Sequence, residues 1–590
     1  MGERQRLVGP AAQTARTVPA LRSNAYNQAQ VVTSFVSRLL RSARPVAALG
    51  IAVALLGILT VAACGQTAGD SAASEFGAGH GRILLVLPFD NRSGQPSLEW
   101  IREAAPEILS SRFASAGFAP MSRADRLYAL DHLGLPQGFH PSRATALKLA
   151  QTLDADSIVV GSFMTDGTGM IAEAQLVDVP HLRMSQTVTA RGEMKDLVDV
   201  FGSLAWKLTR QLDPGFNVAE ETFVAAGKGM RVDAFEQYIR GITEPDHDER
   251  LRHLNQAVTL SPEYAPAWMA LGREDYSSQQ YEQAAAAFAR VGRDDPKLQQ
   301  TDAQEAGFYR GLSLLFSGDY PKAEQVFAAL ARVLPLSEVL NNQGVAVSRQ
   351  GHDSIALFRQ ALQTDPNTAD YHFNLAVSLK RHGDAAEALT ELAACLKLRP
   401  NDSEAQALQV EWTAAPGKQE PAADSGSDDN AKADPLERIA RNFNAVAFRQ
   451  AAQMLDQVDE ARMAALPPEQ RAQKLAQQAR DYLDHGLLLE AERLDQMALA
   501  TDDRVAAVHA GLAEIRQRSG DTANARKEAR TSLELMPSVE AYLVMGRLDL
   551  GAGHLDEATY DAGEGLRIEP GNAALRDLQQ KIEAAKAQRR

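Results

Sequence analysis

Two cysteines, Cys64 and Cys395, are the only thiols in this chain of 590 residues. A thiol can act as a nucleophile, a metal ligand, a disulfide partner or an acceptor of acyl groups. Cys64 ends an apolar run that begins at Val46 and follows three arginines, whereas Cys395 lies in an alanine-rich helical pattern at a position that favours a small residue. We therefore expect a modified Cys64, a buried structural thiol at Cys395, and no disulfide between them.

Motifs that would indicate catalysis are missing from the sequence. It has no Gly-x-x-x-x-Gly-Lys phosphate loop, no His-Glu-x-x-His zinc motif, no Gly-x-Ser-x-Gly nucleophile turn and no cysteines paired at zinc-binding spacing. The twelve histidines are scattered. We predict no enzymatic activity, no metal and no cofactor. The alternative is an enzyme of an unfamiliar class, which would need a deep polar pocket holding a perturbed carboxylate or histidine.

The formal net charge of −15 is distributed unevenly along the chain. The first 63 residues hold seven arginines and one glutamate, so the remaining residues carry −21. Binding to nucleic acid requires clustered lysines and arginines, and no such cluster follows residue 65. We therefore expect no binding to nucleic acid. The composition, 45% hydrophobic and 23% charged, is that of an ordinary globular protein.

Residues 1–64 have the order of a secretory signal, although the basic region is unusually long. The segment Val61-Ala62-Ala63-Cys64 resembles the bacterial lipobox. That resemblance implies that Cys64 is acylated, that the chain is cut before it, and that Gly65 directs the lipoprotein to the outer membrane, facing the periplasm, with the inner membrane as the alternative. An uncleaved signal anchor of about 18 residues remains open. Residues 65–81, rich in Gly, Ala and Ser, predict a flexible tether.

Residues 82–215 predict a small α/β sandwich domain. We expect helices over 98–113, 144–153 and 198–208, and strands over 82–89, 118–122, 157–163, 170–178 and 184–191. The blocks 86–109, 146–163 and 172–179 resemble, in order, the TolB-like or FlgO-like amino-terminal domains of bacterial lipoproteins. Members of that family are generally not enzymes.

The loop Asp90, Asn91, Arg92 and Ser93 follows the first buried strand. The carboxyl ends of strands are where α/β sheets place ligands, but the same residue types also build ordinary turns. The loop is therefore the candidate small-molecule site of an alternative function, a sensor in which the α/β domain binds a ligand and the helical repeats relay the signal.

A period of 34 residues organises residues 231–412. Small residues recur at positions 8 and 20 of each unit, an aromatic or large apolar residue at 24 and proline at 32, as in Gly311, Ala323, Phe327 and Pro335. This spacing resembles the tetratricopeptide repeat (TPR), in which helix pairs stack side by side. It predicts a first array over 231–412 with a capping helix, and weaker repeats predict a second array over 435–590 with a C-terminal helix. Residues 413–434 predict a disordered linker between the arrays.

The predicted fold is therefore multidomain: a small α/β sandwich followed by an all-α TPR superhelix (α-solenoid) in two arrays. The TPR resemblance implies a groove that holds an extended peptide or a helix of a partner protein. Its candidate contacts on the first helix of each pair are Asn341, Asn342, Arg349, His372, Asn374 and Lys380, with solvent-facing polarity as the alternative. We predict a lipid-anchored, non-enzymatic scaffold or adaptor of the cell envelope, with proteins and the membrane as partners.

Overall fold

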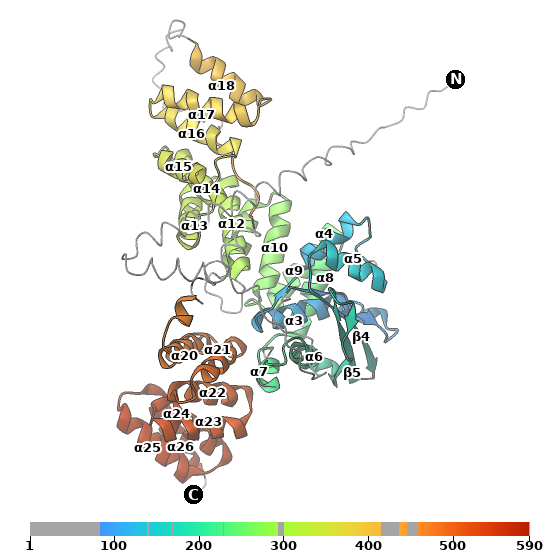
Figure 1. Ribbon diagram of the computed structural model, residues 1–590, viewed down its shortest axis with the longest axis vertical. Helices are drawn as coiled ribbons and strands as arrows, with labels where there is room; N and C mark the ends of the chain where they lie inside the picture. Colours follow the sequence, from blue (N-terminus) through green and yellow to red (C-terminus); the bar gives the residue numbers. More distant parts are fainter. Residues whose placement is uncertain are drawn as a thin grey trace, which may run out of the picture. The chain divides into compact units, whose positions relative to one another are not determined.

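The computed structural model describes residues 83–138, 141–167, 169–227, 229–292, 300–414, 436–444, 458 and 461–588 (Figure 1). These residues form two compact units. Among them, unit 1 holds residues 271–292, 300–414, 436–444 and 458, and unit 2 holds the described residues of 83–270 and 461–588. The predicted signal sequence with Cys64, the tether and nearly all of the linker lie outside the described residues. Within them, no helix has both the length and the apolar character needed to cross a bilayer.

Unit 2 begins with a mixed β-sheet, whose strands are β1 (Ile83–Val86), β2 (Asp90–Asn91), β3 (Ala119–Pro120), β4 (Ser157–Asp166), β5 (Gly169–Asp178), β6 (Arg183–Met184) and β7 (Val188–Glu193). Its strand order is β3-β1-β4-β5-β6, with β2 also paired to β4 and β7 to β5. Strands β1, β2, β3 and β4 pair in parallel, whereas β5 pairs antiparallel with β4, β6 and β7. The sheet therefore combines a buried parallel half with an antiparallel hairpin.

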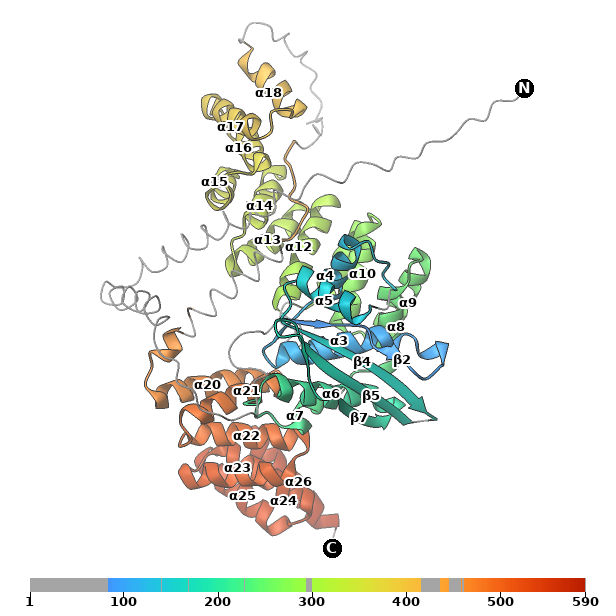
Figure 2. The ribbon, with the colours of Figure 1, turned by 45° about the vertical axis from the view of Figure 1, so that its right-hand side comes forward.

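Helices cover both faces of this sheet (Figure 2). They are α3 (Ile101–Ser115), α4 (Arg123–His132), α5 (Arg143–Thr152) and α6 (Leu197–Leu212), accompanied by the short 3-10 turns Pro96–Leu98 and Met194–Asp196. Helices α3 and α6 pack together, and α6 packs on β5 and β7. On the other face, Leu85 and Ile158 share an apolar cluster with Leu130 of α4 and Leu149 of α5. The α/β sandwich predicted from the sequence is thus confirmed, with a core on each side of the sheet.

Three details of this sandwich differ from the sequence prediction. Helix α4 was not expected, although Ser122 and Asp125 form a complete capping box at its start. The strand expected over 184–191 is divided into β6 and β7, because the Ser185 hydroxyl takes the place of a main-chain partner by accepting from Leu176 N at 2.9 Å. Asp90, expected in a loop, begins the short strand β2.

The rest of unit 2 is helical. Its helices are α7 (Glu220–Ala225), α8 (Val232–Thr243), α9 (His247–Leu260), α20 (Pro468–Asp484), α21 (Leu488–Thr501), α22 (Ala506–Ser519), α23 (Thr522–Leu535), α24 (Val539–Ala552), α25 (Leu555–Ile568) and α26 (Ala573–Gln588). Helices α20 to α25 pack as successive antiparallel pairs and α26 follows on α25. Helix α7 packs on α21 and α22. There the Ala219 amide donates to Glu492 Oε1 at 3.1 Å, and the Thr222 hydroxyl lies 3.4 Å from Ser519 Oγ.

Unit 1 is a stack of helix pairs (Figures 1 and 2). It holds the end of α10 (Ala265–Ser277), then α11 (Tyr281–Arg290), α12 (Gln300–Phe316), α13 (Tyr320–Val333), α14 (Ser337–Arg349), α15 (Ile355–Thr364), α16 (Ala369–Arg381), α17 (Ala385–Leu398) and α18 (Ser403–Thr413). A β-carbon added to Gly311 would lie 2.6 Å from the Phe327 ring, and one added to Gly344 would lie 2.7 Å from the Phe358 ring. The small residue of each first helix therefore makes room for the aromatic ring of the second.

Residues 436–444, expected to open the second array, lie instead on unit 1. They form neither helix nor strand. The predicted boundary at residue 435 is therefore corrected: the second array is described from α20 onward, and the preceding segment belongs to the first array. The reason is that its polar main-chain groups find partners on α14 and α16 that the segment could not supply by itself.

Candidate functional site

The segment Leu436–Asn444, which we call the groove segment, runs along the first helices of the pairs in unit 1. Near its start, the Glu437 carboxylate accepts from the Ser348 hydroxyl at 2.6 Å, at the C-terminal end of α14. Near its end, the Asn444 amide donates to Glu338 Oε1 at 3.2 Å, at the N-terminal end of the same helix. The groove segment therefore runs antiparallel to α14.

Asparagine side chains hold the main chain of the groove segment at two alternate residues. Asn374 donates to the Arg438 carbonyl at 2.8 Å and accepts from the Arg438 amide at 2.7 Å. Asn342 does the same for Ala440, at 2.8 Å in both directions. Asn341 adds a bond to the Arg438 carbonyl at 3.0 Å and accepts from Asn374 at 2.8 Å. The side chains of Asn342 and Asn374 act like a neighbouring β-strand, because each offers one donor to the carbonyl and one acceptor to the amide of the same residue.

The three asparagines are fully buried. A buried amide without a partner costs about 1–3 kcal/mol, so this site requires a main chain to be present or water to replace it. Asn342 and Asn374 each precede the small residue of their helix, Gly344 or Ala376, by two positions. The repeat therefore places equivalent asparagines on neighbouring first helices.

The side chain of Glu437 enters a cationic subsite. Its carboxylate is 1% exposed and is paired with Arg381. Arg349 lies 3.7 Å away through its Nε and donates to the Glu437 carbonyl at 3.2 Å. Arg349 and Arg381 stand five residues after the small residue of their helices, so the repeat also duplicates this charge. The subsite fits a carboxylate because a buried anion needs paired cations and a hydrogen-bond donor.

The next side chain, Arg438, enters an anionic subsite. Its guanidinium donates to Asp402 at 2.6 and 2.8 Å, to Asp370 at 3.1 Å and to Glu404 at 2.9 Å. It also lies over the Phe373 ring, 3.6 Å from the centroid. The bond from Arg438 lowers the pKa of Asp402 to about 2. Burial alone would lower the pKa of Arg438, but the bonds to these carboxylates outweigh burial and raise it.

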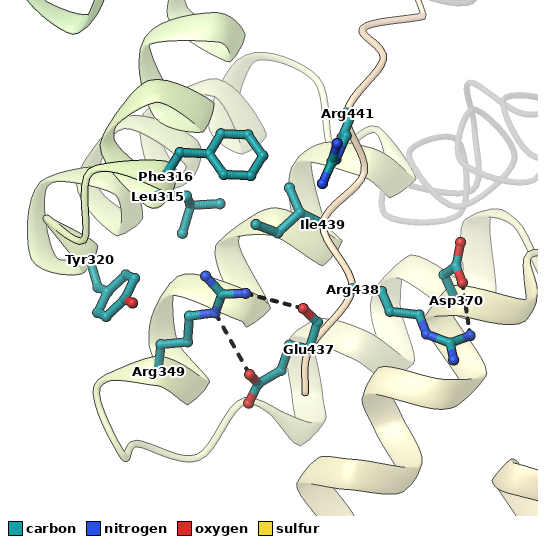
Figure 3. A pocket seen from close by; sticks show the side chains of 9 residues that line it. All are labelled: Leu315, Phe316, Tyr320, Arg349, Asp370, Glu437, Arg438, Ile439 and Arg441. Carbon is teal, nitrogen blue, oxygen red and sulfur yellow. Dashed lines mark hydrogen bonds and ion pairs between the residues drawn. The ribbon is translucent and has the colours of Figure 1, made fainter. Parts of the chain in front are cut away.

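Beside the groove segment lies a pocket with a volume of about 500 Å³. Figure 3 shows its lining, which brings aromatic and apolar side chains of α12 and α13 opposite the groove segment: Leu315, Phe316, Tyr320, Arg349, Asp370, Glu437, Arg438, Ile439 and Arg441. Further along, the Phe443 ring lies 5.5 Å from the ring of Phe308 on α12. The groove segment thus leaves part of the apolar surface of α12 and α13 uncovered.

The structure places four of the six predicted contact residues on the groove segment, namely Asn341, Asn342, Arg349 and Asn374. His372 lies elsewhere: its Nδ1 bonds Glu391 of α17 at 2.6 Å and its Nε2 lies 3.1 Å from the Pro366 carbonyl. Lys380 lies over the Trp412 ring of α18, 5.5 Å from its centroid.

His372 instead joins the two helices of its pair. His509 makes the same arrangement in unit 2, with Glu528 at 2.7 Å and the Asp503 carbonyl at 2.9 Å. The spacing of 19 residues from histidine to glutamate in both arrays is the sequence signal that would have identified this role. Sequence reasoning also missed four charged residues of the subsites: Asp370, Arg381, Asp402 and Glu404.

The loop predicted as a ligand site satisfies its own polar groups. Asn91 accepts from the Ser93 amide at 3.0 Å and donates to the Gln95 carbonyl at 3.0 Å and to Glu99 at 3.1 Å. The Ser93 hydroxyl in turn accepts from the Gln95 amide at 3.2 Å. These are the bonds of a turn. Asp90 and Arg92 are exposed beside it, and the Arg92 amide donates to the Phe163 carbonyl at 2.8 Å.

Cys395 is fully buried in α17, and burial raises the pKa of its thiol. A raised pKa disfavours the reactive thiolate. Its surroundings are the apolar side chains of a cluster between α16, α17 and α18. Among the described residues, no group of three or more His, Cys, Asp or Glu side chains is arranged to hold a metal ion.

Comparison with known proteins agrees with the repeat architecture. Residues 349–411 match the family model of the tetratricopeptide repeat. No curated protein matches the chain.

Among solved structures, the chain is similar to YrrB, described as a TPR protein with an unusual peptide-binding site, at 15% identity over 35% of this chain and 99% of that one, with a TM-score of 0.26. MamA from Desulfovibrio magneticus RS-1 is 21% identical over 28% of this chain and 92% of its own, with a TM-score of 0.25. The C-terminal domain of LpoB from Salmonella enterica is 19% identical over 19% of this chain and 84% of that one, with a TM-score of 0.17. These likenesses cover at most 35% of the chain.

Proposed function

We propose that the protein is a non-enzymatic adaptor that captures an elongated segment of a partner protein in the groove formed by α12, α14 and α16. The observation that supports this function is the pair of bidentate bonds from Asn342 and Asn374 to alternate peptide units. Side-chain amides aimed at a main chain recognise a peptide whatever its sequence, and the flanking charged subsites add selectivity.

The adaptor acts, in this proposal, at the bacterial cell envelope, anchored through an acylated Cys64 in the outer membrane and facing the periplasm. The support for this part is the sequence order of basic region, apolar core and lipobox-like Val61–Cys64. Its amino-terminal sandwich is, in this proposal, a TolB-like domain, supported by the resemblance of the blocks 86–109, 146–163 and 172–179.

The groove is tested by photo-crosslinking in intact cells. A photoreactive amino acid replaces Tyr320, which lines the pocket, and the crosslinked peptides are identified by mass spectrometry. We expect crosslinks to a defined segment of a partner. They should be lost when Asn342→Ala is added to a chain that already carries Glu437→Ala and Arg438→Ala, in which the groove segment has lost its charged anchors. The control is Asn255→Ala, since the Asn255 amide on the exposed face of α9 donates to its own helix at Leu251. Partner crosslinks that persist in the Asn342→Ala variant would refute recognition through the groove.

The anchor is tested separately by Cys64→Ser. Loss of the acyl acceptor should move the protein from the membrane fraction to the soluble fraction, because acyl chains contribute about 0.8 kcal/mol per buried methylene. Unchanged membrane fractionation, together with an unchanged mass of the mature amino terminus, would contradict the lipobox assignment.

A further inference from the structure

The partner-binding groove of this chain is already occupied by the chain itself. Residues 436–444 fill both charged subsites and both asparagine positions. We propose that the groove segment is an internal competitor: it closes the groove until a partner segment of the same chemical pattern displaces it. This inference rests on the proposed function, since it names both the regulation of the groove and the class of peptide that the groove accepts.

The pattern follows from the order of the subsites. The cationic subsite receives a carboxylate at Glu437, and the anionic subsite receives a guanidinium at the next residue, Arg438. Reversing the two residues would place a carboxylate among Asp370 and Asp402 and a guanidinium between Arg349 and Arg381, where like charges repel. The groove therefore selects an acidic residue followed immediately by arginine.

Two further positions restrict the pattern. Ala440 lies with its main chain on Asn342 and its methyl group packs in an apolar cluster with Leu340 and Tyr371, which matches a small apolar residue. Phe443 packs against the aromatic cluster of α12. The partner segment that fits is thus acidic, Arg, aliphatic, small, any residue, any residue, aromatic, in an elongated conformation.

Tethering makes the groove segment an effective competitor. Twenty-two residues separate Thr413, at the end of α18, from Leu436. A segment held by a connection of this length meets its site at an effective concentration on the order of millimolar. A free peptide with a dissociation constant of about 10 µM would then bind the closed protein about 100-fold more weakly than the open groove.

To displace the groove segment, a partner segment needs a contact with the groove that the groove segment does not make. The pocket of about 500 Å³ beside Ile439 offers one, because its wall of Leu315, Phe316 and Tyr320 is not filled by the groove segment (Figure 3). A partner with a larger apolar side chain at the position of Ile439 would bury that surface and gain free energy that the internal competitor does not have.

The test uses a fluorescent peptide with the sequence of residues 436–444, Leu-Glu-Arg-Ile-Ala-Arg-Asn-Phe-Asn, titrated with the full chain and followed by anisotropy. In the opened variant, Glu437→Ala with Arg438→Ala, the groove segment loses both charged anchors while the groove keeps all its residues. We expect the opened variant to bind the probe about 100-fold more tightly than the wild type. Equal affinity for the two proteins would overturn the internal competition.

A charge exchange shows that the probe occupies this groove. Arg381, whose side chain is 44% exposed, is changed by Arg381→Glu in the opened variant. This variant should bind the original probe at least 10-fold more weakly, and a probe carrying Glu437→Lys should recover affinity. Absence of any recovery would contradict the cationic subsite.

Dilution distinguishes the source of the competitor. A segment bound within its own chain blocks the probe equally at all protein concentrations, and this is the result we expect over a 100-fold range. A block that weakens on dilution would overturn the internal arrangement and assign the segment to a second copy. Failure of the proposed function itself would look different: the opened variant would bind the probe, yet crosslinking from Tyr320 would capture no partner.

Discussion

Arg438→Ala should release the groove segment while leaving the helices beneath it folded. The substitution removes two hydrogen bonds to Asp402, one to Asp370, one to Glu404 and the contact with Phe373. Charge-assisted bonds contribute about 1.5–3 kcal/mol each when well shielded, and the contact with the ring about 0.5–2 kcal/mol.

Two features of the structure lower the expected total. The Glu404 carboxylate is half exposed, so its bond contributes little. Asp402 keeps Arg399 as a partner at 3.5 Å, which limits the cost of leaving its carboxylate behind. The expected loss of docking free energy is therefore about 3–5 kcal/mol. If docking is worth less than this, the segment simply detaches and the measured effect equals the docking energy.

Hydrogen exchange followed by mass spectrometry measures the loss of docking free energy directly. The amides of residues 438 and 440 donate to Asn374 and Asn342, so they exchange slowly only while the segment is docked. Since the tethered groove segment closes the groove with an equilibrium constant of about 100, complete detachment lowers their protection up to about 100-fold. Protection in α14 and α16 should change little. Arg441→Ala is the matched control, because its guanidinium is exposed and lies 5.3 Å from the Phe316 ring. Unchanged protection of residues 438 and 440 in Arg438→Ala would refute the reasoning.

Three further predictions concern the same array. Gly344→Ala should destabilise the α14–α15 pair by about 1–3 kcal/mol, because the added methyl group would lie 2.7 Å from the Phe358 ring, as judged by hydrogen exchange of these helices. Acid should weaken the docking of Arg438: its bond lowers the pKa of Asp402 to about 2, so the contribution of Asp402 is complete above about pH 4 and is lost as the pH falls from 4 to 2. The probe uses the same carboxylate, so this loss is measurable as falling probe affinity of the opened variant. Alkali should loosen the α16–α17 pair. Burial alone would lower the pKa of His372, but the hydrogen bond to Glu391 raises it. The stabilisation by His372 is therefore complete below about pH 6.5 and is lost as the pH rises through the raised pKa, which hydrogen exchange in α17 would measure.

Each of these predictions has a matched control. Gly551→Ala, within α24 and with no neighbouring atom within 4 Å of the added carbon, should stabilise its helix by up to about 1 kcal/mol. Asp402→Asn should weaken docking at neutral pH and remove the change in probe affinity between pH 4 and 2. His372→Gln should abolish the alkaline change in α17 exchange, and a change that persists in this variant would contradict the assignment to His372.

The repeat architecture could be predicted from the sequence because its cause is periodic. Glycine opposite phenylalanine, as at Gly311 and Phe327, recurs at fixed spacing, and each helix pair buries its apolar face only against its neighbour. The same periodicity placed Asn342 and Asn374 on the first helices, which is why these candidates lie on the groove segment. The predicted fold class is confirmed, whereas the binding roles of Asn342 and Asn374 stay predictions.

The groove segment could not be predicted because it has no pattern of its own. Nine residues with charges at 437, 438 and 441 bury too little apolar surface to order themselves, and their order comes from partners 34 to 106 residues earlier in the chain. His372 was misassigned for a related reason: position on a first helix does not determine whether a side chain turns toward the groove or toward Glu391.

The packing of α7 on α21 and α22 has a consequence for synthesis at the ribosome. Unit 2 combines stretches from both ends of the described sequence, so the residues that complete it are synthesised after unit 1. Helix α7 ends at Ala225 and α22 ends at Ser519. At about 5–20 residues per second, roughly 15 to 60 s pass between the emergence of these two helix ends. During this interval Thr222 and its neighbours on α7 are without their later-made partners, so a chaperone would find them exposed.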